Sequence, residues 1–229
     1  MPRARVGQSE HVTVIGLGRF GSNLARTLHD LGYDVTAIDL DERTIEDASE
    51  YVTLAAQGDG TDEELLRSLQ VERSEVVIVA YGSIEASLIA TLLLKRMGAR
   101  WVISKASNAL HGELLTRTGA NRVVFPERDD AIRLAHALAV PSINDYISLT
   151  PSSGVAKFAV PAHFTDRTLA DIYAACKANL AVLLIKRRQT VITSPASDER
   201  IQPGDELVVV GPDVAIEAFV ESEPDEDKA

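Results

Sequence analysis

The sequence contains very little cysteine and no long hydrophobic run. Cys176 is the single cysteine among 229 residues, which excludes an intramolecular disulfide and favours a reducing, cytoplasmic setting. Because residues 172–175 beside it are apolar, we expect Cys176 to be a small buried hydrophobe rather than a nucleophile. The longest strongly apolar run, Ala86–Leu94, is roughly half a membrane span, and no apolar signal-peptide segment follows Met1. We therefore expect neither a transmembrane helix nor a secretory leader.

Positive charge is also scarce. Lys and Arg number 23 against 34 Asp and Glu, which gives a formal net charge of −11 and a pI of about 4.9. This imbalance disfavours nucleic acid or an anionic membrane surface as a direct partner. The five histidines form no zinc-binding pattern, and the chain has neither a G-x-S-x-G nucleophile motif nor a Walker lysine motif.

The stretch HVTVIGLGRFG at residues 11–21 is the most informative part of the chain. A strand rich in valine and isoleucine runs directly into a G-x-G-x-x-G turn at Gly16, Gly18 and Gly21, and a helical apolar pattern follows it. Asp39, at the end of a second strand, lies about where the ribose-binding carboxylate of this motif is expected. The pattern predicts a phosphate loop at a helix N-terminus. The alternative is a purely structural glycine turn.

Strands and helices continue to alternate after this unit. We expect strands at 52–56, 75–80, 101–105 and 122–125, and helices at 41–50, 62–69, 83–97, 108–118 and 126–140. Thr61 is expected to cap the helix that begins at Asp62. This alternation predicts an α/β fold, a Rossmann-like doubly wound parallel sheet, over residues 10–141.

The pattern changes after Pro141. Proline, serine and glycine punctuation predicts a linker over 142–153, and a small α+β domain is expected over 154–220. Its expected strands are 155–160, 181–186, 191–192 and 206–210, and its expected helices are 168–177 and 212–220. The acidic residues 221–229 are expected to form a disordered tail, and the polar residues 1–10 to be frayed.

Several motifs, taken in order, resemble the regulator-of-potassium-conductance (RCK) family, also called the Trk/Ktr nucleotide-binding family. They are VIGLGRFG at 14–21, AIDLD at 37–41, QGDGT at 57–61, VIVAYGS at 77–83, the strand ending at Lys105, GANRVVFPERD at 119–129 and ERIQPGDELVVVG at 199–211. The resemblance covers about residues 10–220 and is more specific in the N-terminal part. It implies an RCK N-lobe and a small RCK C-lobe. Because no pore helices are attached, it further implies a separate regulatory subunit of a potassium uptake system, not an enzyme.

The resemblance also implies partners and a location. It implies a homo-oligomer in which dimers join into an octameric ring, with apolar surface of the helix 83–97 or the helix 126–140 buried between subunits. The other partner would be an integral membrane potassium-translocating subunit. The chain would then be cytoplasmic and peripheral to the inner face of the cell membrane.

The resemblance places a set of residues around an adenine nucleotide. They are Gly16, Gly18, Arg19, Phe20, Gly21, Asp39, Leu40, Asp41, Asp59, Gly60, Thr61, Ala80, Tyr81 and Lys105. The glycines would form the phosphate loop, Asp39 would hold the ribose hydroxyls, and the turn at 59–61 would lie on the adenine side. Arg19 and Lys105 would contact phosphates, since a guanidinium makes charge-assisted bonds to a di- or triphosphate. Glu127 matches a glutamate linked to a divalent cation, Mg or Ca, between subunits.

Each of these residues also has a purely structural interpretation. Arg19 and Lys105 could be solvated surface cations, and Asp59 and Thr61 could simply form a turn and a helix cap. Glu127 could be an acidic residue favoured by the dipole of a helix N-terminus.

More than one ligand and more than one class of function are compatible with the sequence. ATP and ADP are favoured by Arg19, NAD is also compatible with Asp39, and NADP is disfavoured by that carboxylate. Cyclic di-AMP could bind the C-lobe near residues 178–180, 186–188 and 194–196, with Arg187 or Arg188 meeting its phosphates; the alternative is a dimerisation lobe without ligand. An NAD-dependent oxidoreductase is the alternative from another class, although the small second domain shows no catalytic constellation. An RCK regulator of another cation transporter or channel is the third interpretation.

Overall fold

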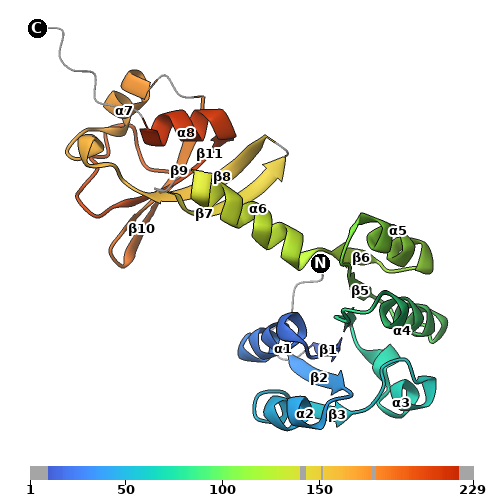
Figure 1. The fold of residues 1–229 in the computed structure, drawn as a ribbon. Helices are drawn as coiled ribbons and strands as arrows, with labels where there is room; N and C mark the ends of the chain where they lie inside the picture. The colour runs from blue at the N-terminus through green and yellow to red at the C-terminus, as the bar shows by residue number, and fades with distance from the viewer. Residues whose placement is uncertain (1–9, 140–142, 151, 177–178, 222–229) are drawn as a thin grey trace, which may run out of the picture. The chain divides into compact units, whose positions relative to one another are not determined.

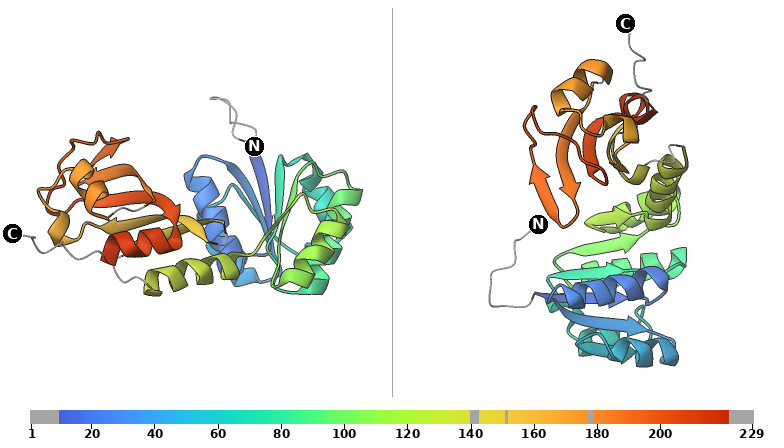
Figure 2. Two further views of the ribbon diagram at one scale, coloured as in Figure 1. Left: turned by 90° about the horizontal axis from the view of Figure 1, so that it is seen from above. Right: turned by 90° about the vertical axis from the view of Figure 1, so that its left-hand side faces the viewer.

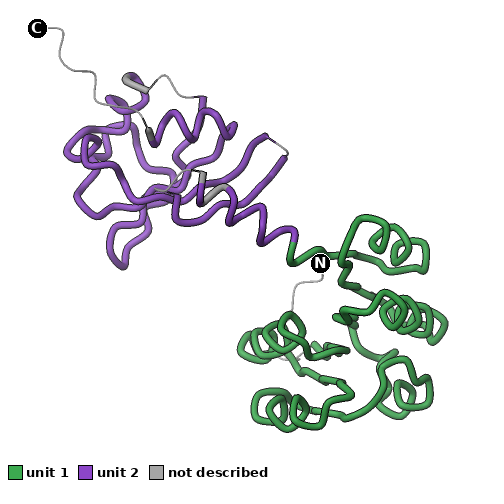
Figure 3. The backbone as a smooth tube through the Cα atoms, viewed as in Figure 1, with its two compact units in different colours: residues 1–127 green, residues 128–229 purple. Residues whose placement is uncertain are grey.

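The computed structural model of the protein describes residues 10–139, 143–150, 152–176 and 179–221. The chain divides into two compact units, residues 1–127 and 128–229 (Figure 3). The predicted acidic tail and frayed N-terminus lie almost wholly outside the described residues, as does the side chain of Cys176. None of the helices in the described segments combines the length and apolar character needed to cross a bilayer.

The first unit is built on a six-stranded parallel sheet in the order β3-β2-β1-β4-β5-β6. The strands are β1 His11–Ile15, β2 Asp34–Asp39, β3 Leu54–Gln57, β4 Val76–Val79, β5 Val102–Lys105 and β6 Arg122–Val124. This confirms the predicted Rossmann-like sheet. The strand order reverses between β1 and β4, and in such sheets the crevice at the carboxyl ends of those two strands is the ligand-binding position.

Helices cover both faces of this sheet (Figures 1 and 2). Their bounds are α1 Arg19–Asp30, α2 Glu42–Ser49, α3 Glu63–Ser68, α4 Ile84–Arg96 and α5 Ala109–Thr118, with a 3-10 turn at Val71–Arg73. The next helix, α6 Pro126–Ala139, follows β6 in the chain and belongs almost wholly to the second unit. Alternate residues of the central strands enter two separate cores. Val14 and Ala37 pack in the cluster that contains Leu24 of α1, whereas Ile15 and Ile38 pack in the cluster that contains Leu94 of α4. Burial on both faces explains why the neighbouring central strand β4, Val76–Val79, is apolar at every position.

Two local expectations for the first unit are wrong. The cap of α3 is Asp62, whose carboxylate accepts the Glu64 N–H at 2.9 Å, and not Thr61. The Thr61 N–H and hydroxyl both donate to Asp59, each at 2.8 Å, so Thr61 closes the 59–61 turn and does not cap the helix. Strand β3 starts at Leu54 rather than at Val52, because the Val52 N–H still donates to Ala48 at the end of α2.

The second unit is an antiparallel sheet of five strands in the order β10-β9-β11-β8-β7. The elements are β7 Ile143–Thr150, β8 Ser153–Ala159, a 3-10 turn at Ala162–Phe164, α7 Leu169–Cys176, β9 Ala181–Arg187, β10 Thr190–Thr193, β11 Glu206–Pro212 and α8 Asp213–Glu221. The core of the unit lies on one face of this sheet, where Phe158 of β8 meets Phe219 of α8 edge-to-face at 6.0 Å between ring centroids. The predicted small α+β domain is confirmed.

The predicted linker over 142–153 is wrong, because most of it is strand β7, which pairs with β8. Ile143 and Tyr146 are buried in the core of the second unit, and the Tyr146 hydroxyl donates to the Asp213 carboxylate at 2.5 Å. Burial and that carboxylate raise the pKa of Tyr146, so its phenol stays protonated. The exposed polar residues between the buried ones made this stretch resemble a loop. The predicted boundary at 141 falls in 140–142, outside the described residues, and the two compact units divide at 127/128, within α6.

Candidate functional site

The glycine loop between β1 and α1 has the shape that its sequence predicts. Gly16 has φ of +90°, a conformation that favours glycine, and its N–H donates to the Ile38 carbonyl at 2.8 Å. At Gly21 a Cβ atom would lie 1.9 Å from the Gly16 carbonyl oxygen. The third glycine therefore allows α1 to pack directly against the loop.

The N-terminus of α1 differs from those of its neighbours. Asp41, Asp62, Ser83 and Asn108 cap helices α2 to α5 with their side chains. Gly18, the N-cap of α1, supplies no side-chain cap, and the first turn of α1 holds no acidic residue. A Cβ at Gly18 would meet no atom within 4 Å. The start of α1 is thus left open to an anion, and the aligned N–H groups and helix dipole favour one there.

Asp39 lies against this loop, as the sequence predicts. Its Oδ2 atom accepts the Leu17 N–H at 2.5 Å, and its Oδ1 atom accepts the Asp41 N–H at 2.9 Å. A carboxylate has about four acceptor positions, so these two bonds orient Asp39 without exhausting it. Leu40 beside it is exposed, whereas the carboxylate of Asp41 caps α2 and has its pKa lowered by the hydrogen bonds from Thr44.

The ends of β3 and β4 meet at the same edge. The Gly60 N–H donates to the Tyr81 hydroxyl at 3.0 Å, next to the turn in which Thr61 bonds Asp59. Burial raises the pKa of Tyr81, and the negative charges of Asp59 and Asp39 raise it further, so the phenol stays neutral. Ala80 is buried, and its N–H donates to the Ile15 carbonyl at 2.8 Å, which ties β4 to β1 at the crevice.

A lysine and a glutamate form an ion pair beside the glycine loop. The Lys105 Nζ atom at the end of β5 forms an ion pair with the Glu127 Oε1 atom at 2.6 Å, and it lies 6.0 Å from the centroid of the Phe20 ring. The hydrogen bond from Lys105 lowers the pKa of Glu127, partial burial opposes this, and the positive charge of Arg19 lowers the pKa further. Glu127 therefore stays ionised in its ion pair with Lys105. The structure thus brings all of the predicted site residues to the carboxyl edge of the sheet.

A neighbouring groove was not foreseen from the sequence. It lies between α1 and α2 and is lined by Leu17, Arg19, Ser22, Asn23, Arg26, Thr44, Asp47, Glu50 and Tyr51. The Arg26 guanidinium stacks on the Tyr51 ring, 3.9 Å from its centroid. The sequence does carry a signal for this groove, since positions 19, 22, 23 and 26 are polar and lie on one face of α1. A polar helix face is usually interpreted as solvent-exposed surface, so the sequence did not predict a groove there.

Histidines and acids do not assemble a metal site in the part of the chain that the structure describes. His111 is buried between α4 and α5, where its Nε2 atom lies 2.7 Å from the Ser87 hydroxyl and its Nδ1 atom accepts the Ser107 N–H at 3.2 Å. Burial lowers the pKa of His111, so the ring is neutral and structural. A cation beside Glu127 would need further ligands from a bound molecule or a partner.

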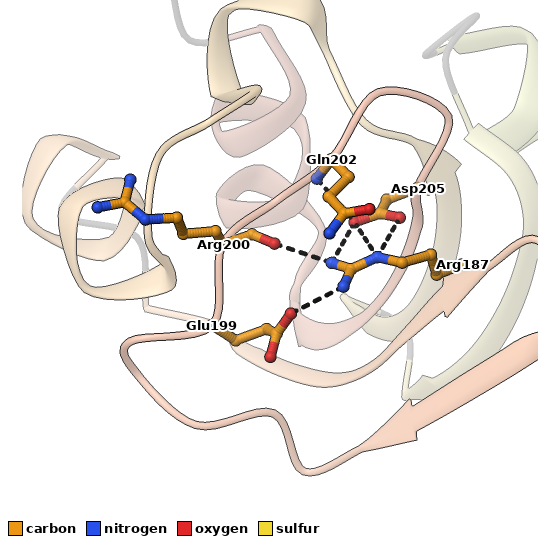
Figure 4. Close-up of polar contacts among 5 residues, drawn as sticks. All are labelled: Arg187, Glu199, Arg200, Gln202 and Asp205. Carbon is orange, nitrogen blue, oxygen red and sulfur yellow. Dashed lines mark hydrogen bonds and ion pairs between the residues drawn. The ribbon is translucent and has the colours of Figure 1, made fainter.

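In the second unit, Arg187 is committed to the protein itself (Figure 4). Its guanidinium donates to the carboxylates of Asp205 and Glu199 and to the Arg200 carbonyl, at 2.8–3.3 Å. Asp205 is 1% exposed and also accepts the Gln202 N–H at 2.9 Å. The expectation that Arg187 meets a ligand phosphate is not supported, because the buried carboxylate needs this guanidinium as its partner. Arg188 next to it is exposed.

The parallel sheet and the open glycine loop at its switch point define a Rossmann-type domain. The TrkA-N domain family matches residues 12–126, and the TrkA-C domain family matches residues 155–222. The chain therefore belongs to the TrkA-N/TrkA-C family, which confirms the resemblance to RCK domains.

Individual relatives agree with this assignment. The chain is 36% identical over 207 residues to Ktr system potassium uptake protein C of Bacillus subtilis (strain 168), an alignment that covers 90% of this chain and 94% of the relative. Among solved structures, the GsuK RCK domain matches with a TM-score of 0.63 at 19% identity, and the GsuK channel bound to NAD with a TM-score of 0.62 at 20% identity. Both matches cover 98% of this chain, but it spans only 50% and 41% of those two chains. At such identities these structures support the fold alone.

Proposed function

We propose that this protein is the adenine-nucleotide-binding regulatory subunit of a Ktr/Trk-type potassium uptake system. The observation that carries the proposal is the uncapped N-terminus of α1 behind the glycine loop, with Asp39 held against it. The similarity to a Ktr system potassium uptake protein over nearly the whole length of both chains supports the potassium-transport role. The protein would act at the inner face of the cell membrane, next to an integral membrane subunit that translocates potassium.

In this proposal different site residues bind different parts of the nucleotide. The loop 16–21 and the start of α1 hold the phosphates, and the free acceptor positions of Asp39 take the ribose hydroxyls. The turn at 59–61 and Tyr81 lie on the adenine side. Arg19 and Lys105 contact the outer phosphates, and Glu127 joins a divalent cation bound to those phosphates. NAD is the alternative ligand, a choice supported by the GsuK channel structure with NAD bound.

Asp39→Ala should weaken the binding of ADP and ATP by about 1–3 kcal/mol, because it removes the acceptor for the ribose hydroxyls. Isothermal titration calorimetry measures the change. Asp30→Ala, at the exposed end of α1, is the matched control and should bind as the wild type does. Since Asp39 also orients Leu17, circular dichroism must show that the variant is folded. Unchanged affinity in a folded Asp39→Ala protein would remove Asp39 from the site.

The proposed regulation requires an assembly. Several large apolar side chains of α4 and α6 are exposed: Ile84, Ile89, Leu92, Ile132, Leu134 and Leu138. Exposed apolar surface of this kind marks interaction sites, and we assign it to contacts between copies of the chain in a ring of dimers, an octamer. A strict monomer in light scattering at micromolar concentration, with nucleotide present, would contradict this assignment.

For the second unit we propose dimerisation without a ligand. If the protein retained cyclic di-AMP in a filter assay at tens of micromolar ligand, the second unit would instead be a binding site for that dinucleotide.

The proposed switch is a change of ring shape between the ATP and ADP complexes. A ligand shifts a two-state equilibrium only by its differential affinity, so ATP and ADP must favour different states. A tenfold preference is worth about 1.4 kcal/mol per site, and several sites in one ring add their biases. Arg19 is suited to read the terminal phosphate, because it is exposed at the first position of α1, directly after the glycine turn, and its guanidinium can make several charge-assisted bonds to a phosphate.

We expect small-angle scattering to give different profiles for the ATP and ADP complexes. Arg19→Ala should reduce this difference more than it reduces adenosine binding. Arg67→Ala removes an exposed cation of α3 that pairs only locally with Glu63, and it should leave both profiles unchanged. Superimposable wild-type profiles for ATP and ADP would contradict a switch read from the terminal phosphate and leave the nucleotide a structural cofactor. Co-purification of a different class of membrane transporter would redirect the proposal to that transporter.

A further inference from the structure

The ion pair between Lys105 and Glu127 has an unusual position among the charge pairs of the first unit. Arg67–Glu63 and Arg117–Glu113 are exposed pairs one turn apart on a single helix, and Arg100–Glu75 is an exposed pair at the opposite edge of the sheet, before β5 and β4. Lys105–Glu127 instead joins the end of β5 to the first turn of α6 at 2.6 Å, beside the glycine loop. Local pairs stabilise their own helix, whereas this pair neutralises a cation of the candidate site.

The two partners differ in their freedom. The Lys105 side chain is 15% exposed and its ammonium lies 6.0 Å from the Phe20 ring, so it is confined at the crevice. The Glu127 side chain is 68% exposed and can turn into solvent without disrupting the core. An exchange of partners at Lys105 would therefore move the carboxylate and leave the ammonium in place.

Glu127 also occupies the environment that an anionic ligand requires. It is the one carboxylate paired with Lys105 within the described residues, and the charge of Arg19 acts on it as well. A terminal phosphate carries more negative charge than a carboxylate and offers more acceptor atoms, so it competes for the same two cations with an advantage. A ligand without phosphate has no such advantage.

We propose that Glu127 is an internal competitor for the phosphate subsite: in the empty protein its carboxylate holds the Lys105 ammonium, and the outer phosphates of the nucleotide displace it. This inference rests on the proposed function, because it takes an adenine nucleotide as the ligand. It adds a self-inhibitory contact that lowers the affinity for phosphate-rich ligands. Binding of the phosphates then frees the Glu127 carboxylate from Lys105, and the freed carboxylate can bind a cation.

The test is titration calorimetry of ATP, ADP and adenosine with excess chelator, so that no divalent cation contributes. Removing the competing charge with Glu127→Gln should tighten ATP binding by about two- to fivefold, the size of a partly exposed ion pair. The gain should be smaller for ADP and absent for adenosine. Glu113→Gln removes the carboxylate of an exposed pair on α5 and should change none of the three affinities.

A second variant shows whether the gain passes through Lys105. Lys105→Met should weaken ATP binding, and in that background Glu127→Gln should no longer tighten it. If Glu127→Gln bound ATP no more tightly than the wild type in chelator, the inference would be overturned. It would also be overturned if Glu127→Gln still tightened ATP binding in the Lys105→Met background. Failure of the wild-type protein to bind any nucleotide would instead overturn the proposed function. Repeating the titrations with excess Mg²⁺ tests the proposed role of Glu127 as a cation ligand separately from its role as a competitor. With Mg²⁺ present, Glu127→Gln should bind ATP more weakly than the wild type does, because it lacks the carboxylate that would hold the metal.

Discussion

Gly21→Ala is expected to destabilise the first unit strongly, while Gly18→Ala leaves it folded. A Cβ at position 21 would lie 1.9 Å from the Gly16 carbonyl oxygen and 3.3 Å from the Ala80 side chain. Both neighbours belong to the packed junction of β1, β4 and α1, so the helix must move as a whole. The better helix propensity of alanine recovers only about 1 kcal/mol. We expect a net loss of about 2 kcal/mol or more in the free energy of unfolding.

Gly18→Ala is the matched control for this prediction. Gly18 has φ of −62°, which alanine adopts readily, and its Cβ would meet no atom within 4 Å. Stability should change by no more than about 1 kcal/mol, the scale of an N-cap substitution. Nucleotide affinity should fall nevertheless, because the new methyl group stands where the phosphates approach α1. Urea unfolding followed by circular dichroism measures the first effect and calorimetry the second.

The outcomes are separable. An unchanged unfolding midpoint for Gly21→Ala would contradict the close packing of α1 on the glycine loop. Undiminished nucleotide binding by a folded Gly18→Ala protein would contradict the placement of the phosphates at the start of α1.

Arg187→Met should cost the second unit about 3 kcal/mol of unfolding free energy, because it leaves the buried Asp205 carboxylate without its cation. Asp205 is 1% exposed, and its carboxylate would retain only the Gln202 N–H among the hydrogen bonds described for it (Figure 4). The side chain of Arg187 is 22% exposed, so some water can enter and the loss should stay near the lower end of the range for buried pairs. Chemical unfolding monitored by circular dichroism measures the loss.

Lys186→Met, one residue earlier in β9, is the matched control. Lys186 pairs with Glu206 at the surface, and Glu206 keeps a second ion pair with Lys157, so the change should be within about 1 kcal/mol. Asp205→Asn tests the same network from the other side: it can retain the hydrogen bond from Gln202 but loses the charge that Arg187 faces. Equal stability of Arg187→Met and Lys186→Met would show that the Arg187 network is no stronger than a surface pair.

The glycine loop is a part of the fold that could be predicted from the sequence alone. The spacing of Gly16, Gly18 and Gly21 places a strand, a turn and a helix within a few residues, and local backbone sterics decide that geometry. The same holds for β2, because Asp39 is its last residue and must emerge at the carboxyl edge of a parallel sheet. Alternation of strands and helices then leaves few topologies for the first unit.

Where the sequence analysis was wrong, contacts distant in the chain decided the outcome. Strand β7 is polar at half of its positions, and its strand structure depends on burying Ile143 and Tyr146 against the core and on the bond to Asp213. Likewise, the spacing in β9 does not distinguish a ligand-binding arginine from a structural one. Asp205, which becomes buried only when β9 and β11 pair, requires the guanidinium of Arg187.

The sequence by itself thus determined the order of the elements, the Rossmann-like class and the phosphate loop, because strand and helix periodicity and glycine sterics act over a few neighbouring residues. Only the tertiary structure decided how the charges are partnered. Lys105 and Glu127 come from separate elements and meet because β5 and β6 are adjacent, which brings the start of α6 to the end of β5. Partner choice among charges depends on burial and on distances across the fold, and neither is encoded in the local pattern.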